Sequence, residues 1–471
     1  MLLKYFYDQK VAHASYMVGC QRTGEAIIID PARDIEQYIH EAEENDMRIV
    51  AATETHIHAD FVSGARELAE RTGAKLYLSD EGDKDWKYLY LDGYEHQLVN
   101  DGSTFMVGNV KFEVMHTPGH TPESISFILT DMGGGADKPM GIFTGDFVFV
   151  GSIGRPDLLE KAAGIVGTSD SGARQMFNSV QRFKQLPDYL QVWPAHGAGS
   201  ACGKGLGAIP SSTVGYEKLF NPAMAYEDED EFVTYLLADQ PEPPKYFAVM
   251  KRVNKEGPAV LHKIPVPELL PANRMKDLLA AGKMVVDTRS AGSFAGRHVP
   301  GTINIPADLL PNWAGWLVDY EKPVYLIVDP EDVYQAVRDL IYIGIDNVAG
   351  YFEIDAIETL AEAGVAPQAY QVATPHTVSD KVLNGDVVLV DVRNETEWNE
   401  GHIPGAKHVM LGYLLERAEE VVNGKPIVVQ CRSGSRSAIG ASILQAKGAK
   451  EVINLQGGIR DWAAASLPVE L

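Results

Sequence analysis

Thr55-His-Ile-His-Ala-Asp60 stands directly after Arg48–Thr53, an apolar stretch that predicts a β-strand. Three more short motifs also lie just past apolar strands; they are Thr117-Pro-Gly-His120, Thr144-Gly-Asp146 and Pro194-Ala-His-Gly197. Loops at strand ends are where an α/β scaffold brings distant parts of the chain together. Imidazole and carboxylate groups are good ligands for a divalent transition metal. The four motifs therefore predict a metal site on an α/β fold.

Residues 1–258 alternate predicted helices and strands around these motifs. The predicted helices include Ile35–Glu44 and the amphipathic Phe61–Arg71, and the acidic run Glu227–Glu231 indicates the solvated start of another. Further predicted strands are Glu25–Asp30, Lys111–Met115, Ser124–Leu129, Gly141–Thr144 and Gln191–Trp193. The break at Lys255-Glu-Gly-Pro258 closes this α/β region.

The rest of the chain contains an internal repeat. In both copies an aspartate is followed 11 residues later by the histidine of an H-[VI]-P-G motif, from Asp287 to His298 and from Asp391 to His402. Each copy then has Lys-Pro leading an apolar strand. The repeat predicts two further α/β domains, at residues 262–368 and 369–471.

The second copy contains Val428-Val-Gln-Cys431-Arg-Ser-Gly-Ser-Arg436, which predicts a strand, a cysteine, a short loop and a helix start. Loop amides and a helix N-terminus form an anion-binding nest, which would stabilise an anionic sulfur. We expect Cys431 to be a nucleophile. The predicted substrate-binding residues around it are Arg432, Ser433, Gly434, Ser435 and Arg436. The first copy has Asp329-Pro-Glu-Asp332 in the equivalent loop, with no cysteine, and is predicted to be catalytically silent.

The chain has 471 residues with 41 basic and 65 acidic side chains, a formal charge of −24. Nucleic acids and anionic membranes both reward clustered basic residues, so the charge argues against either as a partner. No apolar run approaches the roughly 20 residues that cross a bilayer. The three cysteines do not form a disulfide framework. They suit a reducing compartment, and we expect a cytoplasmic protein.

The ordered motifs H-x-H-x-D, T-P-G-H, T-G-D and P-A-H resemble the metallo-β-lactamase superfamily, which implies an αββα sandwich for residues 1–258. In the dinuclear hydrolases of that superfamily the first motif ends in another histidine, whereas this chain has Phe61. The persulfide dioxygenase branch resembles the sequence more closely. That resemblance implies one Fe(II) per chain, held by His56, His120 and Asp146. Two histidines and one carboxylate with open positions suit non-haem iron.

Other residues of the motifs receive supporting roles from the same resemblance. Three of them are expected to orient the ligands or the substrate, or to bind zinc if the metal is different: His58, Asp60 and His196. Arg155, in a G-R-x-D signature, is predicted to hold an anionic group of the substrate; the alternative is a structural salt bridge with Asp157. Cys202 is a possible auxiliary thiol or a bystander, and Cys20 is expected in the core.

The Cys431 region resembles the rhodanese sulfurtransferases, and the whole chain resembles bacterial fusions of a persulfide dioxygenase with rhodanese domains. The implied reaction converts R-S-SH, O2 and water into R-SH and sulfite. A persulfide on Cys431 then gives sulfur to sulfite and forms thiosulfate. The implied partners are a low-molecular-weight thiol persulfide, O2 and sulfite, and such fusions are often homo-oligomers.

Two other functions remain open. One is a zinc-dependent thioester hydrolase that resembles glyoxalase II, fused to a sulfurtransferase. Phe61 argues against it, because a two-metal hydrolase favours histidine at that position. The other is a tandem rhodanese module that mainly docks partner proteins as a sulfur carrier.

Overall fold

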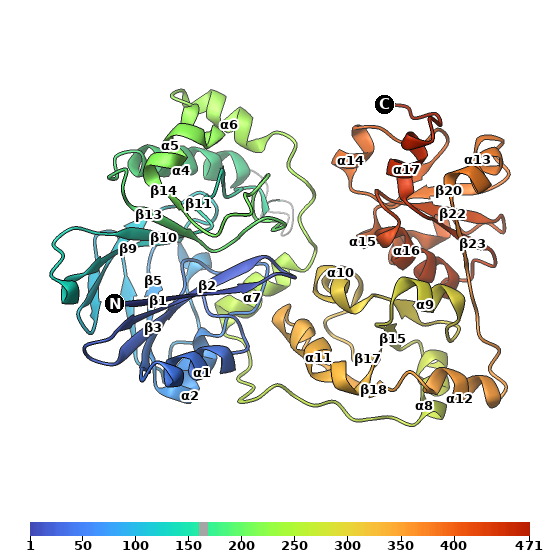
Figure 1. Ribbon diagram of the computed structural model, residues 1–471, viewed down its shortest axis with the longest axis horizontal. Helices are drawn as coiled ribbons and strands as arrows, with labels where there is room; N and C mark the ends of the chain where they lie inside the picture. The colour runs from blue at the N-terminus through green and yellow to red at the C-terminus, as the bar shows by residue number, and fades with distance from the viewer. Residues whose placement is uncertain (159, 161–167) are drawn as a thin grey trace. The chain divides into compact units, whose positions relative to one another are not determined.

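The computed structural model describes residues 1–158, 160 and 168–471. Its residues form two compact units, the first comprising 1–264 with 342–344 and the second comprising 265–341 with 345–471 (Figure 1).

Two six-stranded sheets form the first unit. One has the order β1-β2-β3-β4-β5-β6, with β1 (Leu2–Asp8), β2 (His13–Cys20), β3 (Glu25–Ile29), β4 (Arg48–Thr53), β5 (Lys75–Ser79) and β6 (His96–Val99). The other has the order β14-β13-β10-β9-β8-β7, with β7 (Thr104–Val107), β8 (Val110–His116), β9 (Ile125–Asp131), β10 (Gly141–Gly145), β13 (Gln191–Pro194) and β14 (Ser212–Thr213). A separate hairpin pairs β11 (Val148–Phe149) with β12 (Ser152–Ile153).

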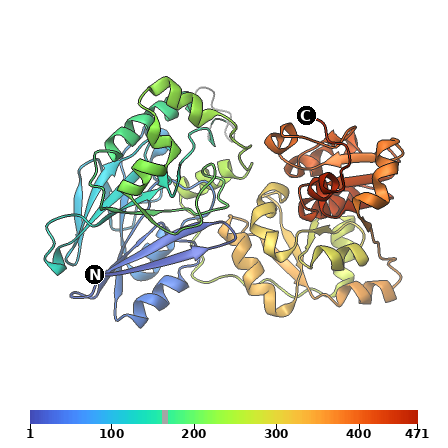
Figure 2. The same ribbon diagram turned by 45° about the horizontal axis from the view of Figure 1, so that its top comes forward.

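Helices cover the outer faces of the two sheets (Figures 1 and 2). They are α1 (Glu36–Glu44), α2 (Ala65–Thr72), α4 (Thr168–Phe183), α5 (Val214–Phe220), α6 (Glu229–Leu237) and α7 (Phe247–Glu256). Short 3-10 turns are η1 (Lys84–Trp86), η2 (Met132–Gly134) and η3 (Pro222–Ala225).

Alternation along the strands explains these layers. Ile27 and Ile29 of β3 join Phe143 of β10 in the core between the two sheets. Ile28, which points to the opposite face, packs in the core that also contains Leu68 of α2. Ile142 of β10 likewise belongs to the core that contains residues of α4. The αββα sandwich predicted for this region is confirmed.

The sequence predicts two helix starts that can be compared with the structure. The predicted start of a helix at the acidic run is confirmed, because Asp228 caps α6 by accepting the backbone N–H groups of Asp230 and Glu231, both at 3.0 Å. The prediction of a helix from Phe61 is wrong at its start, since α2 begins at Ala65. The side chain of Asn254 takes up backbone groups between His58 and Ser63, which holds this segment in an irregular loop.

The second unit contains a four-stranded and a five-stranded sheet, and four strands follow the same order in both. In the first, β16-β15-β17-β18, the strands are β15 (Met284–Asp287), β16 (Ile303–Asn304), β17 (Val324–Ile327) and β18 (Val348–Phe352). In the second, β21-β20-β22-β23-β19, they are β19 (Gln371–Ala373), β20 (Val388–Asp391), β21 (Lys407–His408), β22 (Ile427–Gln430) and β23 (Val452–Leu455). The repeat seen in the sequence therefore has a structural counterpart, and the boundaries of the two domains stay a prediction.

The helices of the first repeat are α8 (Ala272–Ala280), α9 (Ala291–Gly296), α10 (Leu310–Leu317), α11 (Val333–Tyr342) and α12 (Ala356–Glu362), with turns η4 (Ala307–Leu309) and η5 (Pro330–Asp332). Those of the second are α13 (Pro375–Leu383), α14 (Glu395–Asn399), α15 (Leu411–Arg417), α16 (Ser435–Ala446) and α17 (Gly458–Ala464), with turn η6 (Ala418–Glu420).

Helix α16 connects the two repeats of the second unit. It is buried continuously from Ser437 to Gln445. The hydroxyl of Ser442 accepts the backbone N–H of Asn304, at the end of β16, at 3.0 Å. The first repeat thus covers the helix that follows Cys431, which gives it a packing role.

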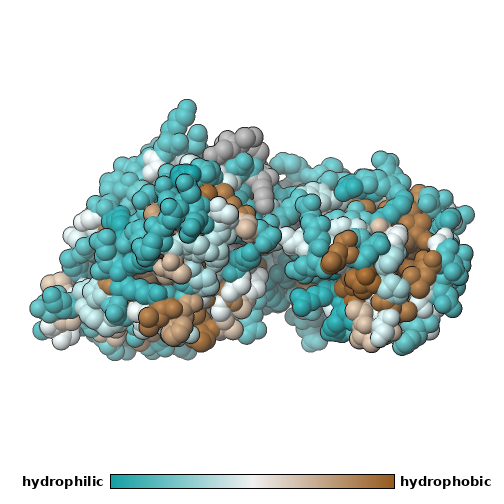
Figure 3. Space-filling view, turned by 90° about the horizontal axis from the view of Figure 1, so that it is seen from above, coloured by the Kyte–Doolittle hydropathy of each residue, from teal (hydrophilic) through white to brown (hydrophobic). Residues whose placement is uncertain are grey.

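The face drawn in Figure 3 is mostly hydrophilic and carries separate hydrophobic patches. Within the described part of the chain, no helix has both the length and the apolar character needed to cross a membrane.

We predict that Gly119→Ala destabilises the first unit strongly. Gly119 has φ +144°, and a Cβ there would lie 2.6 Å from the Cα of Met176 on α4. Strain and overpacking together should lower the free energy of unfolding by about 2–4 kcal/mol. Gly73→Ala is the matched control, because Gly73 has φ +70° with nothing near its missing Cβ; it should cost only about 1 kcal/mol. Equal shifts of the first unit's unfolding transition in urea would contradict this prediction.

Candidate metal centre and cysteine site

The predicted metal-binding motifs meet at one edge of the sandwich. His56 follows β4, and His120 lies in the loop between β8 and β9. Asp146 and His196 follow β10 and β13, which pair in parallel and so end at the same edge. The ligand atoms of His56, His120 and Asp146 all lie within 4.8 Å of one another, and the three side chains are buried.

Hydrogen bonds turn both imidazoles so that Nε2 faces the carboxylate. The Nδ1 atom of His120 bonds the carbonyl oxygen of Arg155 at 2.9 Å, and Nδ1 of His56 lies 3.1 Å from the hydroxyl of Thr55. The Nε2 atoms of His56 and His120 lie 3.8 and 3.4 Å from Oδ2 of Asp146. A ring held through Nδ1–H presents the Nε2 lone pair, which is the form that binds a metal.

The electrostatics keep this pair of histidines neutral. Burial and the neighbouring His58 hold the pKa of His56 well below its usual value. Burial also lowers the pKa of His120, although Asp146 opposes it. Nε2 of His56 and both carboxylate oxygens of Asp146 are buried without a hydrogen-bond partner among the described residues. Buried polar atoms are rarely left unsatisfied, and these are the atoms that a metal ion would bind.

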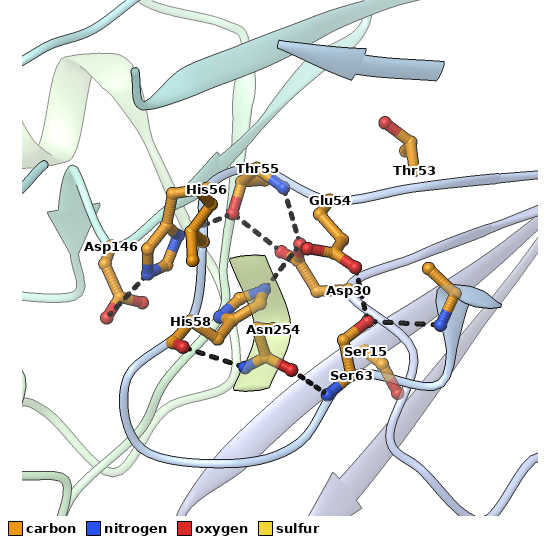
Figure 4. A network of polar contacts seen from close by, with 12 residues as sticks. Ser15, Asp30, Thr53, Glu54, Thr55, His56, His58, Ser63, Asp146 and Asn254 are labelled. Atoms are coloured by element: carbon orange, nitrogen blue, oxygen red, sulfur yellow. Dashed lines mark hydrogen bonds and ion pairs between the residues drawn. The ribbon is translucent and has the colours of Figure 1, made fainter. Parts of the chain in front are cut away.

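The carboxylate of Asp30 orients the first metal-binding motif (Figure 4). This residue is not among those predicted from the sequence. It accepts the backbone N–H of Thr55 at 2.6 Å and the Thr55 hydroxyl at 2.9 Å. Its Oδ1 also lies 3.0 Å from Nε2 of His58. Burial favours a neutral imidazole, but Asp30 outweighs it and raises the pKa of His58 to about 9. His58 is therefore an ion-pair partner of Asp30, and its ring lies beside that of His56, with centroids 4.2 Å apart.

Asn254, on α7, holds the other end of the same loop (Figure 4). Its amide donates to the carbonyl oxygens of His58 and Phe61 at 2.8 and 2.7 Å, and its oxygen accepts the N–H of Ser63 at 2.9 Å. Residue type alone gave no signal for this role, because Asn254 lies about two hundred residues along the chain from the loop that it contacts.

A second group of possible ligands comprises Asp60, His196 and Cys202, whose ligand atoms also lie within 4.8 Å of one another. His196 Nε2 lies 3.1 Å from Asp60 Oδ2 and 3.4 Å from Asp146 Oδ1. The carboxylates outweigh burial and raise the pKa of His196 well above its usual value. Burial and the same two aspartates raise the pKa of the Cys202 thiol. These groups form an imidazolium held between two carboxylates beside a neutral thiol.

Phe61 is buried where a dinuclear hydrolase would have a histidine. Its ring lies against those of His58 and His13, with centroids 4.4 and 3.8 Å apart. It offers no ligand atom and packs in the core on the helix side of the first sheet.

Arg155 is buried and paired. Its guanidinium makes a two-point salt bridge with Asp157, at 2.7 and 2.6 Å, and donates to the carbonyl oxygen of Pro241. This is the structural alternative that the sequence left open. Nη1 of Arg155 is buried without a hydrogen-bond partner among the described residues, and a role of Arg155 in substrate binding stays a prediction.

Comparisons with known proteins agree with this architecture. Residues 9–196 match the Metallo-beta-lactamase superfamily, and residues 374–465 match the Rhodanese-like domain family. A solved structure described as a metallo-beta-lactamase from Staphylococcus aureus is 46% identical, covers 75% of this chain and 99% of its own, and has a TM-score of 0.68. The mitochondrial persulfide dioxygenase ETHE1 of Bos taurus is 26% identical over 50% of this chain and 79% of its own.

A beta-lactamase hydrolase-like protein of Xylella fastidiosa is 29% identical over 56% of this chain, and the match spans only 61% of that protein's length. Fold, buried ligand set and comparisons together define an α/β protein with a candidate metal site and a rhodanese-like region. The chain belongs to the metallo-β-lactamase superfamily and carries a C-terminal rhodanese-like domain.

In the rhodanese-like domain, Cys431 is buried at the end of β22, and the loop after it leads into α16. The backbone N–H of Gly434 donates to its sulfur at 3.1 Å. The Ser437 hydroxyl lies 3.4 Å from the sulfur and donates to Oδ1 of Asn454 at 2.6 Å. The sulfur of Cys431 therefore faces the amide of Gly434 at the start of the loop, and its role as a nucleophile stays a prediction.

Two ion pairs hold neighbouring parts of this domain: one joins the start of α16 to α14, and the other lies at the end of β20. Arg436 makes a two-point salt bridge with Glu397 at 2.6 and 2.7 Å. Arg393 pairs with Asp391 and donates to the carbonyl oxygen of Gly401 at 2.8 Å. Arg432, Ser433 and Ser435 are exposed around the loop, where an incoming anion can reach them.

The first repeat has the same arginine–aspartate pair at the end of its strand but no cysteine nucleophile. Arg289 pairs with Asp287 and donates to the carbonyl oxygen of Arg297, as Arg393 does in the second repeat. After β17, the equivalent loop presents the exposed acids Asp329, Glu331 and Asp332. This loop has no thiol and three carboxylates, and the catalytic silence of the first repeat stays a prediction.

We predict that metal content depends on the neutral-histidine cluster alone. His120→Ala or Asp146→Asn should reduce bound metal, measured by mass spectrometry of the purified protein, by at least about tenfold. Cys202→Ser should retain about one ion per chain, because a ligand set that lacks Cys202 remains complete. Two ions in the unaltered protein, falling to one in Cys202→Ser, would contradict the single-metal assignment.

We predict an acid-dependent contribution to stability from Glu397. Burial favours its neutral form, but Arg436 outweighs burial and holds the pKa of Glu397 below its usual 4.5. The stabilisation is thus fully present above about pH 4.5 and is lost as the pH falls through the lowered pKa. Glu397→Gln should lower the free energy of unfolding of the second unit by about 1–3 kcal/mol at neutral pH. Glu395→Gln, at an exposed position of the same helix, is the control; equal effects of the two variants would refute the prediction.

Proposed function

We propose that the protein is an iron(II) persulfide dioxygenase joined to a thiosulfate-forming sulfurtransferase. The observation that carries the proposal is the buried set of two neutral histidines and one carboxylate, His56, His120 and Asp146, whose ligand atoms lie within 4.8 Å of one another. Among them, Nε2 of His56 and both oxygens of Asp146 have no hydrogen-bond partner among the described residues. This donor set suits non-haem iron with open positions. Phe61 in place of a further ligand favours one ion over two. The similarity to the persulfide dioxygenase of Bos taurus supports the same assignment.

Residues 1–258 would carry out the oxidation R-S-SH + O2 + H2O → R-SH + sulfite. The iron, when bound, would supply the redox chemistry that O2 requires. The role of the chain is to hold His56 and His120 in the neutral form that binds the ion. Asp30 and Asn254 fix the loop that carries His56, and Phe61 keeps that side of the centre apolar.

Residues 369–471 would carry out sulfur transfer, with the 262–368 repeat in a packing role. The thiolate of Cys431 attacks the outer sulfur of R-S-SH, the S–S bond breaks, and R-S⁻ leaves and takes the proton. Sulfite then attacks the outer sulfur of the Cys431 persulfide, which gives thiosulfate and regenerates the thiolate. The donors around Cys431 and the arginines of its loop would stabilise both anions. A cytoplasmic location, where persulfides and reduced thiols occur together, would suit this chemistry.

The second candidate is a zinc-dependent thioester hydrolase with the same sulfurtransferase attached. The second ligand group, Asp60, His196 and Cys202, favours it, since a second ion bound there would share Asp146 with the first. Phe61 opposes it, because its side chain offers no ligand atom where a dinuclear hydrolase would have a histidine.

We predict that the two activities separate by mutation. Protein purified anaerobically should contain about one iron per chain and consume O2 when a glutathione persulfide is added. His120→Ala should lower persulfide-dependent O2 uptake at least about a hundredfold. Cys431→Ala should keep O2 uptake and sulfite release but form no thiosulfate. An oxygen electrode and chromatography of sulfite and thiosulfate measure these outcomes.

Zinc in place of iron, with thioester cleavage and no O2 uptake, would reject the dioxygenase in favour of the hydrolase. Thiosulfate formation that survives Cys431→Ala would reject the sulfurtransferase. It would leave the rhodanese region with a docking role if that variant kept its protein partners.

A further inference from the structure

Residues 342–344 belong to the first compact unit, although the sequence places them in the first repeat. Tyr342, the last residue of α11, is buried in the core that also contains Phe61 and Leu68. Its carbonyl oxygen accepts the backbone N–H of Val62 at 2.8 Å. A residue from the repeat without a nucleophile therefore forms part of the core beside the metal-binding loop.

The hydroxyl of Tyr342 fixes the ring of His13, at the start of β2. Nδ1 of His13 lies 2.6 Å from this hydroxyl, and both side chains are buried. The other ring nitrogen, Nε2, has no hydrogen-bond partner among the described residues. Because one hydrogen bond leaves an imidazole only a small range of orientations in a packed core, the Tyr342 hydroxyl sets the direction in which the ring faces.

Four aromatic rings form a packed row from His13 to the proposed ligand His56. The centroids of His13 and Phe61 lie 3.8 Å apart, and those of Phe61 and His58 lie 4.4 Å apart. The ring of His58 in turn lies 4.2 Å from that of His56. Protein cores are packed so closely that a shift of one side chain displaces the next. The row therefore connects the orientation of His13, and with it the hydroxyl of Tyr342, to that of His56.

We infer that Tyr342 is a positioning residue of the metal centre, which acts by holding His13 and so limiting the movement of the packed rings up to His56. This inference rests on the proposed function and gives the first repeat a part in the oxidation. Asp30 fixes the same row from its side, through the contact with His58. Without the Tyr342 hydroxyl the ligands stay in place, but His56 gains freedom, and a small misplacement of this kind slows a reaction markedly.

Tyr342→Phe removes the hydroxyl and keeps the ring. In the full-length protein this variant should bind about one metal ion per chain and lower kcat for O2 uptake with glutathione persulfide about tenfold, with KM unchanged. Tyr370→Phe is the matched control. Tyr370 is also buried, and its hydroxyl donates to the carbonyl oxygen of Ala438 at 3.4 Å, within the second unit. This control should leave O2 uptake unchanged.

A double-mutant cycle tests the route through His13. His13→Phe keeps an aromatic ring against Phe61 and removes the nitrogen that contacts Tyr342. The single variants His13→Phe and Tyr342→Phe should each lower kcat about tenfold, and the double variant should be no slower than either, because both changes remove the same contact.

Cobalt(II) added to the metal-free protein gives a readout that does not depend on turnover. The visible absorption of this ion reports the geometry of its ligands. Tyr342→Phe and His13→Phe should shift or broaden the spectrum in the same way, whereas Tyr370→Phe should leave it unchanged. Thermal unfolding shows that each variant is folded at the temperature of the assay.

The outcomes separate this inference from the proposed function. An unchanged kcat with an unchanged cobalt spectrum in Tyr342→Phe would overturn the inference, and so would losses that multiply in the double variant. Should Tyr342→Phe not fold, His13→Phe decides the same question through its cobalt spectrum. If the spectra shift as expected but no persulfide supports O2 uptake by the unaltered protein, the dioxygenase proposal fails and the positioning role of Tyr342 stands.

Discussion

The buried carboxylate of Asp30 is the constraint on which the metal centre depends. It sits at the end of β3, in the left-handed backbone region with φ +50°, where it reaches across to the loop after β4. There it fixes Thr55 through the backbone and the hydroxyl, and His58 through the ring. Because the Thr55 hydroxyl donates its proton to Asp30, its oxygen is free to accept from Nδ1 of His56. One acid thereby sets the orientation of His58 and, through Thr55, that of His56.

A second layer of buried acids supports the same loops. Burial raises the pKa of both Glu54 and Glu123 to about 7. Glu54 accepts the hydroxyls of Ser63 and Tyr88 at 2.5 and 2.9 Å, and Glu123 accepts the backbone N–H of Ile57 at 2.8 Å. Such groups cost free energy to bury unless they are hydrogen-bonded. Glu54 and Glu123 lie beside the first metal-binding motif. This position indicates that they hold irregular backbone, whose polar groups no neighbouring strand could satisfy.

Sequence patterns predicted the strands and the ligand cluster because both depend on local, periodic signals. The boundaries of Arg48–Thr53 are the same in sequence and structure, and the residues that follow four predicted strands meet at one edge. The signals failed where a distant side chain replaces a local one. Asn254 keeps the segment before Ala65 out of α2. This contact leaves no mark in the spacing of apolar residues, so the start of the helix could not be predicted from it.

The pKa shifts of four buried histidines divide them into two pairs. Burial keeps His56 neutral and, against the opposing effect of Asp146, also His120, whereas neighbouring carboxylates keep His58 and His196 charged. A neutral ring offers a lone pair, and a charged ring offers only N–H donors. The charged rings are also the ones paired with acids, with Asp30 and with Asp60. Phe61, in place of a ligand, is consistent with this division. The charged ring of His196 already balances the carboxylates of Asp60 and Asp146, so no second metal cation is needed there.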